Sequence, residues 1–420
     1  MSASDRSVRI IVQNNLCISC GICGGVCTAG SISYEKTNGM YYPVIDESCV
    51  SCGRCMRCCP KSALVTFEEL DLIMEEEEKN TYLSAKTRCD DVLKNATSGG
   101  VITTLVDKLL KDGSYDCAFL VRGYSCKEPL QSVYVCTGDN LSDTQGSRYL
   151  PVMHTEAVNY MLSNRSDRII FVGTPCFFHG LTKVISEFDL ERDNYLLLGL
   201  FCAQVMNYNS TDYFENKLGA EHSLCEIHYR DKSCGGWPGN VSITNEKGEK
   251  IVLNKRERMA IKEYYMPESC LYCVDKLNKN ADIAVGDDYT KALDTVNGAS
   301  SVIIRSERGQ SCFDNEMFVT KVSSSKEINR TQKVGDLVKH RYFYHRMCIE
   351  KLFKSTKDIP DISNKKKLDR EYKRQLLKIE LGKNNNIKKI SGFVNRRLRK
   401  EKSCLWIILR KVVRRAGFLK

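Results

Sequence analysis

Short apolar runs alternate with helical patterns along the middle of the chain. A helix is predicted to begin after Ser98 and to end at Gly113, because its apolar residues recur at helical spacing and form one stripe. The continuous apolar runs between such patterns are typical of buried strands. They cover residues 116–123, 168–173, 195–202 and 281–286. This alternation predicts a mixed α/β domain, which we place at residues 91–353.

Polar segments border this domain on both sides. Residues 68–90 open with an acidic stretch that contains the run Glu75 to Glu78, and we expect a solvated linker or helix there. Residues 354–392 are rich in lysine and contain three consecutive asparagines, so we expect a flexible connection. A basic amphipathic helix is predicted for the last segment, residues 393–420.

Length and composition leave room for a large core. With 420 residues, of which 42% are hydrophobic, the chain is long enough for two or three structural units. No apolar run approaches the roughly 18 residues that a membrane span requires. Residues 1–16 lack the apolar core of a signal peptide, so the 22 cysteines indicate a reducing cytoplasm in which thiolates hold metal. We therefore expect a cytoplasmic protein.

The positive charge is confined to the end of the chain. Residues 361–420 contain 20 Lys or Arg and 5 Asp or Glu, a net charge of +15, which leaves −4 for residues 1–360 because the whole chain carries +11. The predicted basic helix could lie on the anionic inner surface of a membrane, or dock on a partner subunit or on an acidic patch of this chain. Nucleic-acid binding is not expected, because the basic residues are restricted to one tail.

The chemistry is indicated most clearly by a cysteine pattern that occurs twice, 32 residues apart. Each copy reads Cys-x2-Cys-x2-Cys-x3-Cys, which is the ligand run of a bacterial-type ferredoxin with two 4Fe-4S clusters, and we place this ferredoxin domain at residues 1–67. In such ferredoxins the fourth cysteine of each run binds the other cluster. One cluster is therefore assigned to Cys17, Cys20, Cys23 and Cys59, and the other to Cys49, Cys52, Cys55 and Cys27.

Zinc and disulfides are the competing interpretations of these runs. Structural zinc sites favour Cys-x2-Cys pairs separated by a longer gap, and disulfides belong to secreted chains. Both fit a doubled run of closely spaced cysteines less well than clusters do. Cys58, beside Cys59, could compete for ligation, but we treat it as a bystander.

Four further cysteines lie at the ends of predicted strands or in short loops. By spacing alone, an isolated cysteine such as Cys176 or Cys202 is more often a buried hydrophobic residue than a ligand. The pair Cys270 and Cys273 is a moderate signal for a metal or redox site. The remaining thiols are expected to be packing or surface residues: Cys89, Cys117, Cys126, Cys136, Cys225, Cys234, Cys312, Cys348 and Cys404.

Seven short blocks, taken in order, resemble the beta subunit of coenzyme F-420 hydrogenases and dehydrogenases. With the ferredoxin run in front, the resemblance extends over roughly residues 10–325. The blocks are Ser98-Gly99-Gly100-Val101, Gly146-Ser147-Arg148-Tyr149, Gly173-Thr174-Pro175-Cys176, Gly199-Leu200-Phe201-Cys202, Tyr229-Arg230-x-Lys232, Cys270-x2-Cys273-x-Asp275, and Ala281-Asp282-Ile283 running to Gly286-Asp287.

The resemblance implies an FAD-containing electron-transfer subunit with a third 4Fe-4S cluster near the flavin. The ligands of that cluster would be Cys176, Cys202, Cys270 and Cys273.

The same resemblance directs attention to the helix that begins after Ser98, where free backbone N–H groups could hold the pyrophosphate of the flavin. An ordinary serine N-cap is the competing interpretation, and no G-x-G-x-x-G motif supports a Rossmann site. For Arg230 and Lys232 the competing interpretation is that they form salt bridges at the surface. The residues implied to line the flavin or substrate pocket are Ser98, Gly99, Gly100, Ser147, Tyr149, Arg230 and Lys232.

Two positions depart from the family pattern. Phe177 stands where members of the family usually have glutamine, and residues 288–290 stand where a Trp-Gly pair is usual. Both departures lie near the implied cluster or substrate face, so the resemblance by itself does not imply a deazaflavin substrate for this chain.

Together these patterns predict an iron-sulfur flavoprotein oxidoreductase. It would pass electrons between the ferredoxin clusters and FAD to reduce or oxidise a small organic substrate, with a ferredoxin or a hydrogenase or dehydrogenase subunit as redox partner. The alternatives are a non-catalytic relay subunit and a ferredoxin fused to a scaffold whose catalytic site has decayed. No general acid is identified, because the 6 histidines are scattered.

Overall fold

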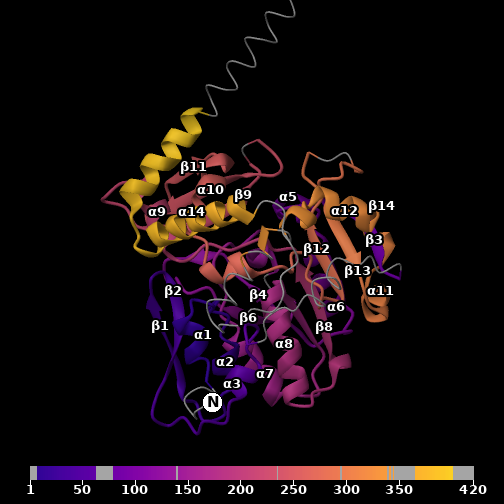
Figure 1. The fold of residues 1–420 in the computed structure, drawn as a ribbon. Coiled ribbons are helices and arrows are strands. Elements are labelled where there is room, and N and C mark those ends of the chain that lie inside the picture. Colours follow the sequence, from indigo (N-terminus) through magenta and orange to yellow (C-terminus); the bar gives the residue numbers. More distant parts are fainter. Residues whose placement is uncertain are drawn as a thin grey trace, which may run out of the picture.

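A large mixed sheet forms the centre of the protein (Figure 1). The computed structural model describes residues 7–62, 79–138, 141–233, 235–293, 296–337, 340–341, 344 and 365–400. Its sheet contains β3 (Thr81–Thr87), β4 (Cys117–Val121), β6 (Val133–Cys136), β7 (Ile169–Gly173), β8 (Tyr195–Leu200), β12 (Ile283–Asp287), β13 (Ser300–Ile304) and β14 (Phe318–Val322). The strand order is β14-β3-β13-β12-β8-β7-β4-β6.

Neighbouring strands β12, β8, β7 and β4 run parallel, whereas the strands outside them pair antiparallel. These four parallel strands are the four that the apolar runs predict, each starting or ending within a few residues of its run. The prediction succeeds because strands with both faces covered read as continuous apolar segments. The mixed α/β fold expected for this domain is confirmed.

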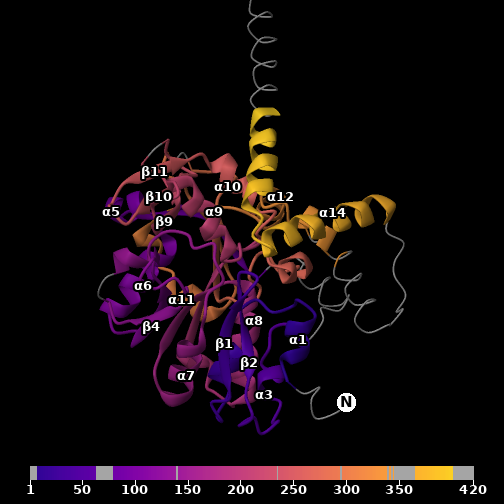
Figure 2. The ribbon, with the colours of Figure 1, turned by 90° about the vertical axis from the view of Figure 1, so that its left-hand side faces the viewer.

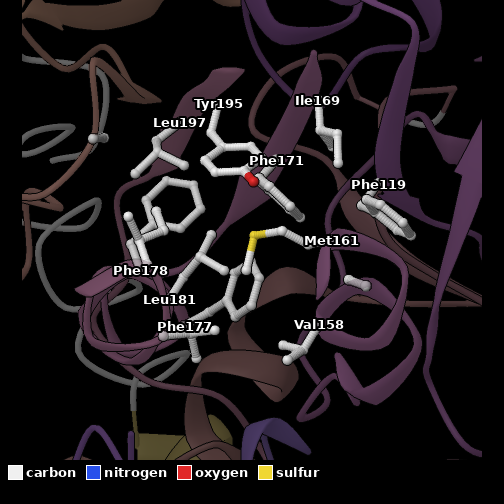
Figure 3. Packing of buried hydrophobic residues seen from close by; sticks show 14 of the residues in the cluster. Phe119, Val158, Met161, Ile169, Phe171, Phe177, Phe178, Leu181, Tyr195 and Leu197 are labelled. Carbon is white, nitrogen blue, oxygen red and sulfur yellow. The ribbon is translucent and has the colours of Figure 1, made fainter. Parts of the chain in front are cut away.

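Alternate side chains of the central strands enter two separate cores. Ile169 and Phe171 pack against residues of helices α7 (Thr155–Ser163) and α8 (Pro175–Glu187), and Figure 3 shows this cluster. Ile170, between them, packs on the opposite face with helix α6 (Val101–Lys111). This period of two is what a pleated strand requires.

Helix α6 confirms the predicted helix after Ser98. The buried residues of its stripe are Val101, Leu105, Val106 and Leu109. Gly113 follows the C-cap with a φ of +70°, a conformation that glycine adopts without steric cost.

The cysteine-rich N-terminal segment packs against α7 and α8, below the sheet in Figure 1. It contains α1 (Arg9–Gln13), α2 (Ile22–Gly25), α3 (Arg54–Arg57) and the antiparallel hairpin of β1 (Ile32–Thr37) and β2 (Met40–Ile45). The approach is close, because a Cβ on Gly180 would lie 2.3 Å from Ile22 and one on Gly25 would lie 2.5 Å from Val158. The segment and the sheet domain therefore share one core.

A second, smaller sheet has the strand order β11-β10-β9-β5. Its strands are β5 (Tyr124–Ser125), β9 (Leu224–Asp231), β10 (Asn240–Asn245) and β11 (Lys250–Leu253), and it packs with helices α9 (Asn209–Leu218) and α10 (Lys255–Ile261) around its own core. The sequence patterns do not predict this sheet.

Two segments expected to be linkers are folded. The linker expectation for residues 68–90 is wrong for its second half, because residues 81–87 form β3 between β14 and β13. The flexible connection expected at residues 354–392 is wrong for residues 365–392, which form helix α14 (Lys365–Lys383) and the start of a further helix at residues 387–400 (Figure 2). Residues 63–78 and 345–364 lie outside the described residues.

Packing explains why the lysine-rich segment folds. Leu368, Tyr372 and Ile379 of α14 are buried, although its exposed positions are mostly charged. The asparagine run forms the turn between the two helices, and the Asn386 side chain accepts a hydrogen bond from the Lys389 N–H. The predicted basic helix therefore begins at residue 387 rather than 393, and residues 401–420 lie outside the described residues. Among the described helices, none has the length and hydropathy of a membrane-spanning segment.

Candidate functional site

The two cysteine runs share one backbone conformation. Gly21 and Gly53, at equivalent positions, each have a φ of +77° and each precede a short helix. Ser19 and Ser51 also match, with φ values of +55° and +54°. The left-handed glycine turns the backbone so that the next cysteines of the run fold back toward the first. The repeat in the sequence is therefore also a repeat in structure.

Cys17, Cys20, Cys23 and Cys59, the first thiol set, line one cavity that is partly open to solvent. The structure thus brings the last cysteine of the second run to three cysteines of the first run. Burial raises the pKa of the Cys17 thiol to about 12 and also raises that of Cys59. Buried thiols of this kind ionise when a cation compensates their charge, which an iron cluster does. The donor set fits the implied cluster.

Tyr34 supports this first thiol set from the hairpin. Its hydroxyl donates to the Gly21 carbonyl at 2.9 Å, accepts the Gly24 N–H at 2.9 Å and lies 3.4 Å from the Cys23 sulfur. Tyr34 therefore fixes the turn that carries the cysteines. Sequence reasoning missed it, because a tyrosine in a hairpin gives no signal by itself.

Cys27, Cys49, Cys52 and Cys55 form the second thiol set. The thiols of Cys49 and Cys52 lie close enough to Cys55 to raise its pKa, although burial is the larger cause. The Cys27 sulfur is 3.2 Å from the Ser31 hydroxyl. Cys52 is exposed, so this set reaches the surface. The bystander Cys58 is fully buried in the core shared with α8.

Cys176, Cys202, Cys270 and Cys273, the third thiol set, come from three separate segments. Cys176 lies in the first turn of α8, directly after β7, and Cys202 follows β8. The other two lie in and after a 3-10 helix at residues 268–272. Burial raises the pKa of the Cys202 thiol well above its usual value, and the facing thiols of Cys176, Cys270 and Cys273 raise it further. The structure therefore brings all four together.

A buried asparagine ties the three segments to one another. The Asn278 amide donates to the carbonyl of Gly173 at 2.9 Å and to that of Leu200 at 3.3 Å, the last residues of β7 and β8. Its own N–H donates to the Asp275 carboxylate at 2.8 Å, two residues beyond Cys273. Asn278 fixes the strand ends relative to the cysteine loop, a role that only the tertiary structure reveals.

Lys61 lies between the first and the third thiol set. It lines the cavity of the first set with Cys59. Burial lowers the pKa of the Lys61 ammonium, but the thiolates of Cys273, Cys176 and Cys270 outweigh burial and raise it, and Cys59 acts in the same direction. One ammonium group therefore faces both sets. Its position two residues after a predicted ligand was the only signal that the sequence offered.

Within the described residues, no three His, Cys, Asp or Glu side chains converge closely enough to hold a single metal ion. A cubane cluster makes a different demand on its ligands. Each thiolate binds a different iron atom, so the four sulfurs remain farther apart than around one ion. The thiols of the first and of the third thiol set face one another, and neither set is a tight single-ion site among the described residues.

The seven residues implied for the flavin, here called the flavin-candidate group, gather around residues 287–300. The Ser147 hydroxyl donates to Thr97 at 3.1 Å, the Ser98 hydroxyl donates to the Ala299 carbonyl, and the Gly99 N–H donates to the Ser300 hydroxyl at 3.0 Å. A Cβ on Gly99 would lie 2.3 Å from the Ala85 carbonyl oxygen. Ser98 and Gly99 thus serve internal packing at the start of α6, and Gly100 is its N-cap with a φ of +74°.

Arg230 connects the small sheet to the large one. Its guanidinium pairs with the Asp287 carboxylate at the end of β12, with nitrogen–oxygen distances of 2.9 and 3.2 Å. Lys232 donates to the carbonyls of Leu93 at 2.7 Å and Asn297 at 2.9 Å. Burial lowers the pKa of Lys232 to about 8. Both cations are therefore bound by the protein and are not surface salt links.

Tyr149 completes the flavin-candidate group next to Arg230. Its hydroxyl lies 3.5 Å from the Arg230 guanidinium, and the Arg258 guanidinium lies 5.0 Å from its ring centre. Burial would raise the pKa of Tyr149, but the charges of Arg258 and Arg230 outweigh it and lower the pKa.

Unsatisfied polar groups flank this position. The Tyr229 hydroxyl and the Trp237 indole N–H are buried without a hydrogen-bond partner in the described structure. The Tyr229 ring stands edge-on to Tyr149, with ring centres 5.2 Å apart. The ring centres of Trp237 and Tyr289 are 5.5 Å apart, and the Tyr289 hydroxyl donates to the Asp287 carboxylate. A polar ring system such as a flavin could satisfy these two groups, so they fit the ring of the implied cofactor. The Ser98 hydroxyl and the Gly99 N–H already donate within the protein, so they do not offer the free donors expected for its pyrophosphate.

The third thiol set and the flavin-candidate group share connecting segments. The chain continues from Cys202 to Met206, whose N–H donates to the Tyr149 carbonyl at 2.6 Å. The buried Gln332 side chain donates to the Asp287 carbonyl at 2.6 Å, and Lys276 donates to the Gln332 carbonyl. The two groups are therefore linked by short chains of contacts.

The two departures from the family pattern are part of the core. Phe177 is buried, and its ring stacks on His154 with ring centres 3.6 Å apart. The His154 N–H donates to the Cys20 carbonyl at 2.8 Å, so this stack supports the first thiol set. Asp288 is buried and accepts hydrogen bonds from Ser84 at 2.6 Å and Ser301 at 3.1 Å. Both residues serve packing between elements.

Helix α14, which the sequence patterns do not predict, covers the loop of the third thiol set. The Tyr372 hydroxyl lies 3.1 Å from that of Tyr272, and Lys383 pairs with Glu268 at 2.8 Å. Both partners flank Cys270 in the 3-10 helix. Helix α14 therefore packs against the loop that carries Cys270.

Two family models match most of the chain beyond its N-terminal segment. Both describe the beta subunit of the coenzyme F420 hydrogenase/dehydrogenase. The model of its N-terminal part matches residues 82–159, and the model of its C-terminal part matches residues 166–327. Together they include all but the first residue of β3 and all cysteines of the third thiol set.

Several curated relatives carry the names of redox proteins. The chain is 25% identical to one of the subunits of the F(420)H(2) dehydrogenase of Methanosarcina mazei, over 72% of this chain and 83% of that protein. It is 24% identical to the coenzyme F420-dependent sulfite reductase of Methanocaldococcus jannaschii over 71% of this chain, but it spans only 46% of that protein. An uncharacterized ferredoxin of the latter organism is 40% identical over 60 residues, 78% of its length.

The family models and the ferredoxin match agree with what the structure brings together: a doubled cysteine run packed onto a mixed α/β domain. The chain thus belongs to the coenzyme F420 hydrogenase/dehydrogenase beta-subunit family and is an iron-sulfur subunit of the oxidoreductase type.

Proposed function

We propose that this chain is an FAD-dependent iron-sulfur oxidoreductase subunit that connects a redox protein partner to a small organic substrate. The three thiol sets would hold three 4Fe-4S clusters, and the flavin-candidate group would hold FAD. When bound, such clusters carry single electrons and FAD exchanges one or two.

The observation that carries the proposal is the position of Lys61. Its ammonium faces thiols of both the first and the third set. The first set belongs to the ferredoxin segment and the third to the α/β domain. An ammonium that acts on thiols of both sets supports the proposal that the two clusters are neighbours across the shared core. Electrons can pass from the ferredoxin segment to the α/β domain only if clusters of the two lie close together. Two domains that function independently would not need neighbouring clusters.

Of the three proposed clusters, the one held by the second thiol set would lie nearest to the protein surface. Cys52 is exposed, and the neighbouring Val50 has 71% of its surface exposed. We infer that the redox partner docks here, since an apolar side chain beside an exposed ligand allows close approach of another protein. Peripheral contact of residues 393–420 with an anionic membrane remains a separate proposal.

Lys61→Met tests the proposal through reduction potentials. The ammonium stabilises added negative charge at both neighbouring sites, so its removal should lower the midpoint potentials of two cluster signals by roughly 60 mV, equivalent to a tenfold change in a one-electron equilibrium. The midpoint potential of the remaining signal, from the cluster of the second thiol set, should stay unchanged. The measurement is a redox titration of anaerobically purified protein monitored by electron paramagnetic resonance.

Lys111→Met is the matched control, because Lys111 is a well-exposed lysine on α6. The control should leave all potentials unchanged. A Lys61→Met variant that shifts only one signal would show that the first and third sites are not neighbours, and that result would overturn the proposal.

A relay subunit without its own substrate is the second candidate function. It is favoured by the observation that Gly99 and Arg230 already use their donors within the protein. Flavin content separates the two candidates: about one FAD per chain supports the oxidoreductase, and a flavin-free chain with full iron content supports the relay.

A further inference from the structure

Cys126 and Cys225 face each other across the small sheet. Strands β5 and β9 pair antiparallel, with Tyr124 opposite Ile227 and Ser125 opposite Glu226. One step further along the same register, Cys126 stands opposite Cys225, and its N–H donates to the Cys225 carbonyl at 3.1 Å. These cysteines belong to none of the three thiol sets.

The backbone geometry allows a covalent bond between them. Directly opposed residues that exchange a backbone hydrogen bond have Cα atoms about 5.5 Å apart, within the span of roughly 4.4–6.8 Å that a disulfide bridges. Their side chains leave the sheet on the same face. The neighbouring Cys126 thiol, ahead of burial, raises the pKa of the Cys225 thiol to about 11.

Accessibility differs between the two thiols. Cys126 is exposed, whereas Cys225 is half-buried. A small oxidant therefore reaches Cys126 first, and Cys225 is placed to resolve the product. An exposed cysteine next to a resolving cysteine is the arrangement of reversible thiol modification sites.

We propose that Cys126 and Cys225 are a dithiol modification site that a low-molecular-weight disulfide converts into a cross-strand disulfide. The Cys126 thiolate attacks one sulfur of oxidised glutathione, which breaks the glutathione disulfide and releases one glutathione thiolate. The Cys225 thiol then attacks the mixed disulfide, forms the Cys126–Cys225 bond, and releases the second glutathione, so its proton ends on that product. Two electrons pass from the protein sulfurs to glutathione.

The new bond would fasten a weakly held strand. β5 has two residues and pairs with β9 alone, at the edge of the small sheet. β9 continues from Cys225 to Arg230, the residue that pairs with Asp287 on the large sheet. The disulfide would thus fix the edge of the sheet that presents the flavin-candidate group. The inference does not depend on cofactor binding.

The test treats the full chain, purified without oxygen, with oxidised glutathione and then blocks free thiols with iodoacetamide in denaturant. Peptide mass spectrometry without reductant should find Cys126 linked to Cys225, with a loss of about two alkylated thiols per chain relative to untreated protein. Dithiothreitol should restore both.

Single variants keep the test decisive. In Cys126→Ser the linked peptide must disappear, and Cys225 should remain alkylated; in Cys89→Ser, which removes another exposed cysteine, the link must persist. Thermal unfolding of Cys126→Ser should match the unmodified protein, because the exposed thiol contributes little packing. The proposal is overturned if Cys126 stops at the mixed disulfide, or if both thiols remain alkylated.

Discussion

Replacing Arg230 tests whether this residue clamps the two sheets together. Only 6% of the Arg230 side chain and 15% of the Asp287 side chain are exposed in their ion pair. In an Arg230→Met variant the Asp287 carboxylate keeps the Tyr289 hydroxyl as a donor but loses its counter-charge. Because removal of one partner leaves an unpaired buried charge, we expect the free energy of unfolding to fall by about 3–5 kcal/mol.

The assay is urea unfolding of anaerobic protein, followed by circular dichroism. Lys111→Met is the control, because the Lys111–Asp107 pair at 2.8 Å is 69% and 38% exposed and should contribute only about 0.3–0.5 kcal/mol. A double variant, Arg230→Met with Asp287→Leu, should regain most of the loss, since two apolar side chains replace both buried charges. Equal losses in Arg230→Met and Lys111→Met would refute the clamp.

Substitutions at Gly99 and Lys232 probe the rest of the flavin-candidate group. In Gly99→Ala the new Cβ would lie 2.3 Å from the Ala85 carbonyl oxygen and 2.8 Å from the Ser300 nitrogen, which are both backbone atoms. The free energy of unfolding, measured by thermal melts, should therefore drop by about 1–3 kcal/mol. An unchanged melting temperature would show that the backbone moves to accommodate the methyl group. Burial, aided by Arg230, lowers the pKa of Lys232 from 10.5 to about 8, so between these values the unfolded chain binds more protons and stability should rise with pH. Lys232→Met should remove that rise between pH 8 and 10.5, and an identical pH profile would exclude this lysine as its source.

The parallel centre of the fold is predictable from sequence, but its surroundings are not. Strands β4, β7, β8 and β12 are covered on both faces and appear as apolar runs. β9 buries one face only, and its polar and apolar residues are mixed, so it produces no clear run. In α14 the buried Leu368, Tyr372 and Ile379 are hidden among lysines, and the fold of this segment depends on tertiary packing.

The candidate site divides in the same way. The first two thiol sets are readable because their cysteines are close in the sequence and the spacing itself reflects the cluster. The third set comes from segments nearly 100 residues apart, so only the family resemblance groups it. Lys61 and Asn278 gain their roles from contacts across the core, which no local pattern encodes.

Iron, sulfide and flavin content per chain, measured on anaerobically purified protein, tests the central claim most directly. The account predicts about twelve iron atoms and one FAD, with a fall to about eight iron atoms in the Cys270→Ala, Cys273→Ala double variant. Cys58→Ala, which changes a buried cysteine outside the three thiol sets, should retain about twelve. About eight iron atoms in both the unmodified protein and the double variant would contradict the third cluster and with it the proposed connection between the ferredoxin segment and the flavin.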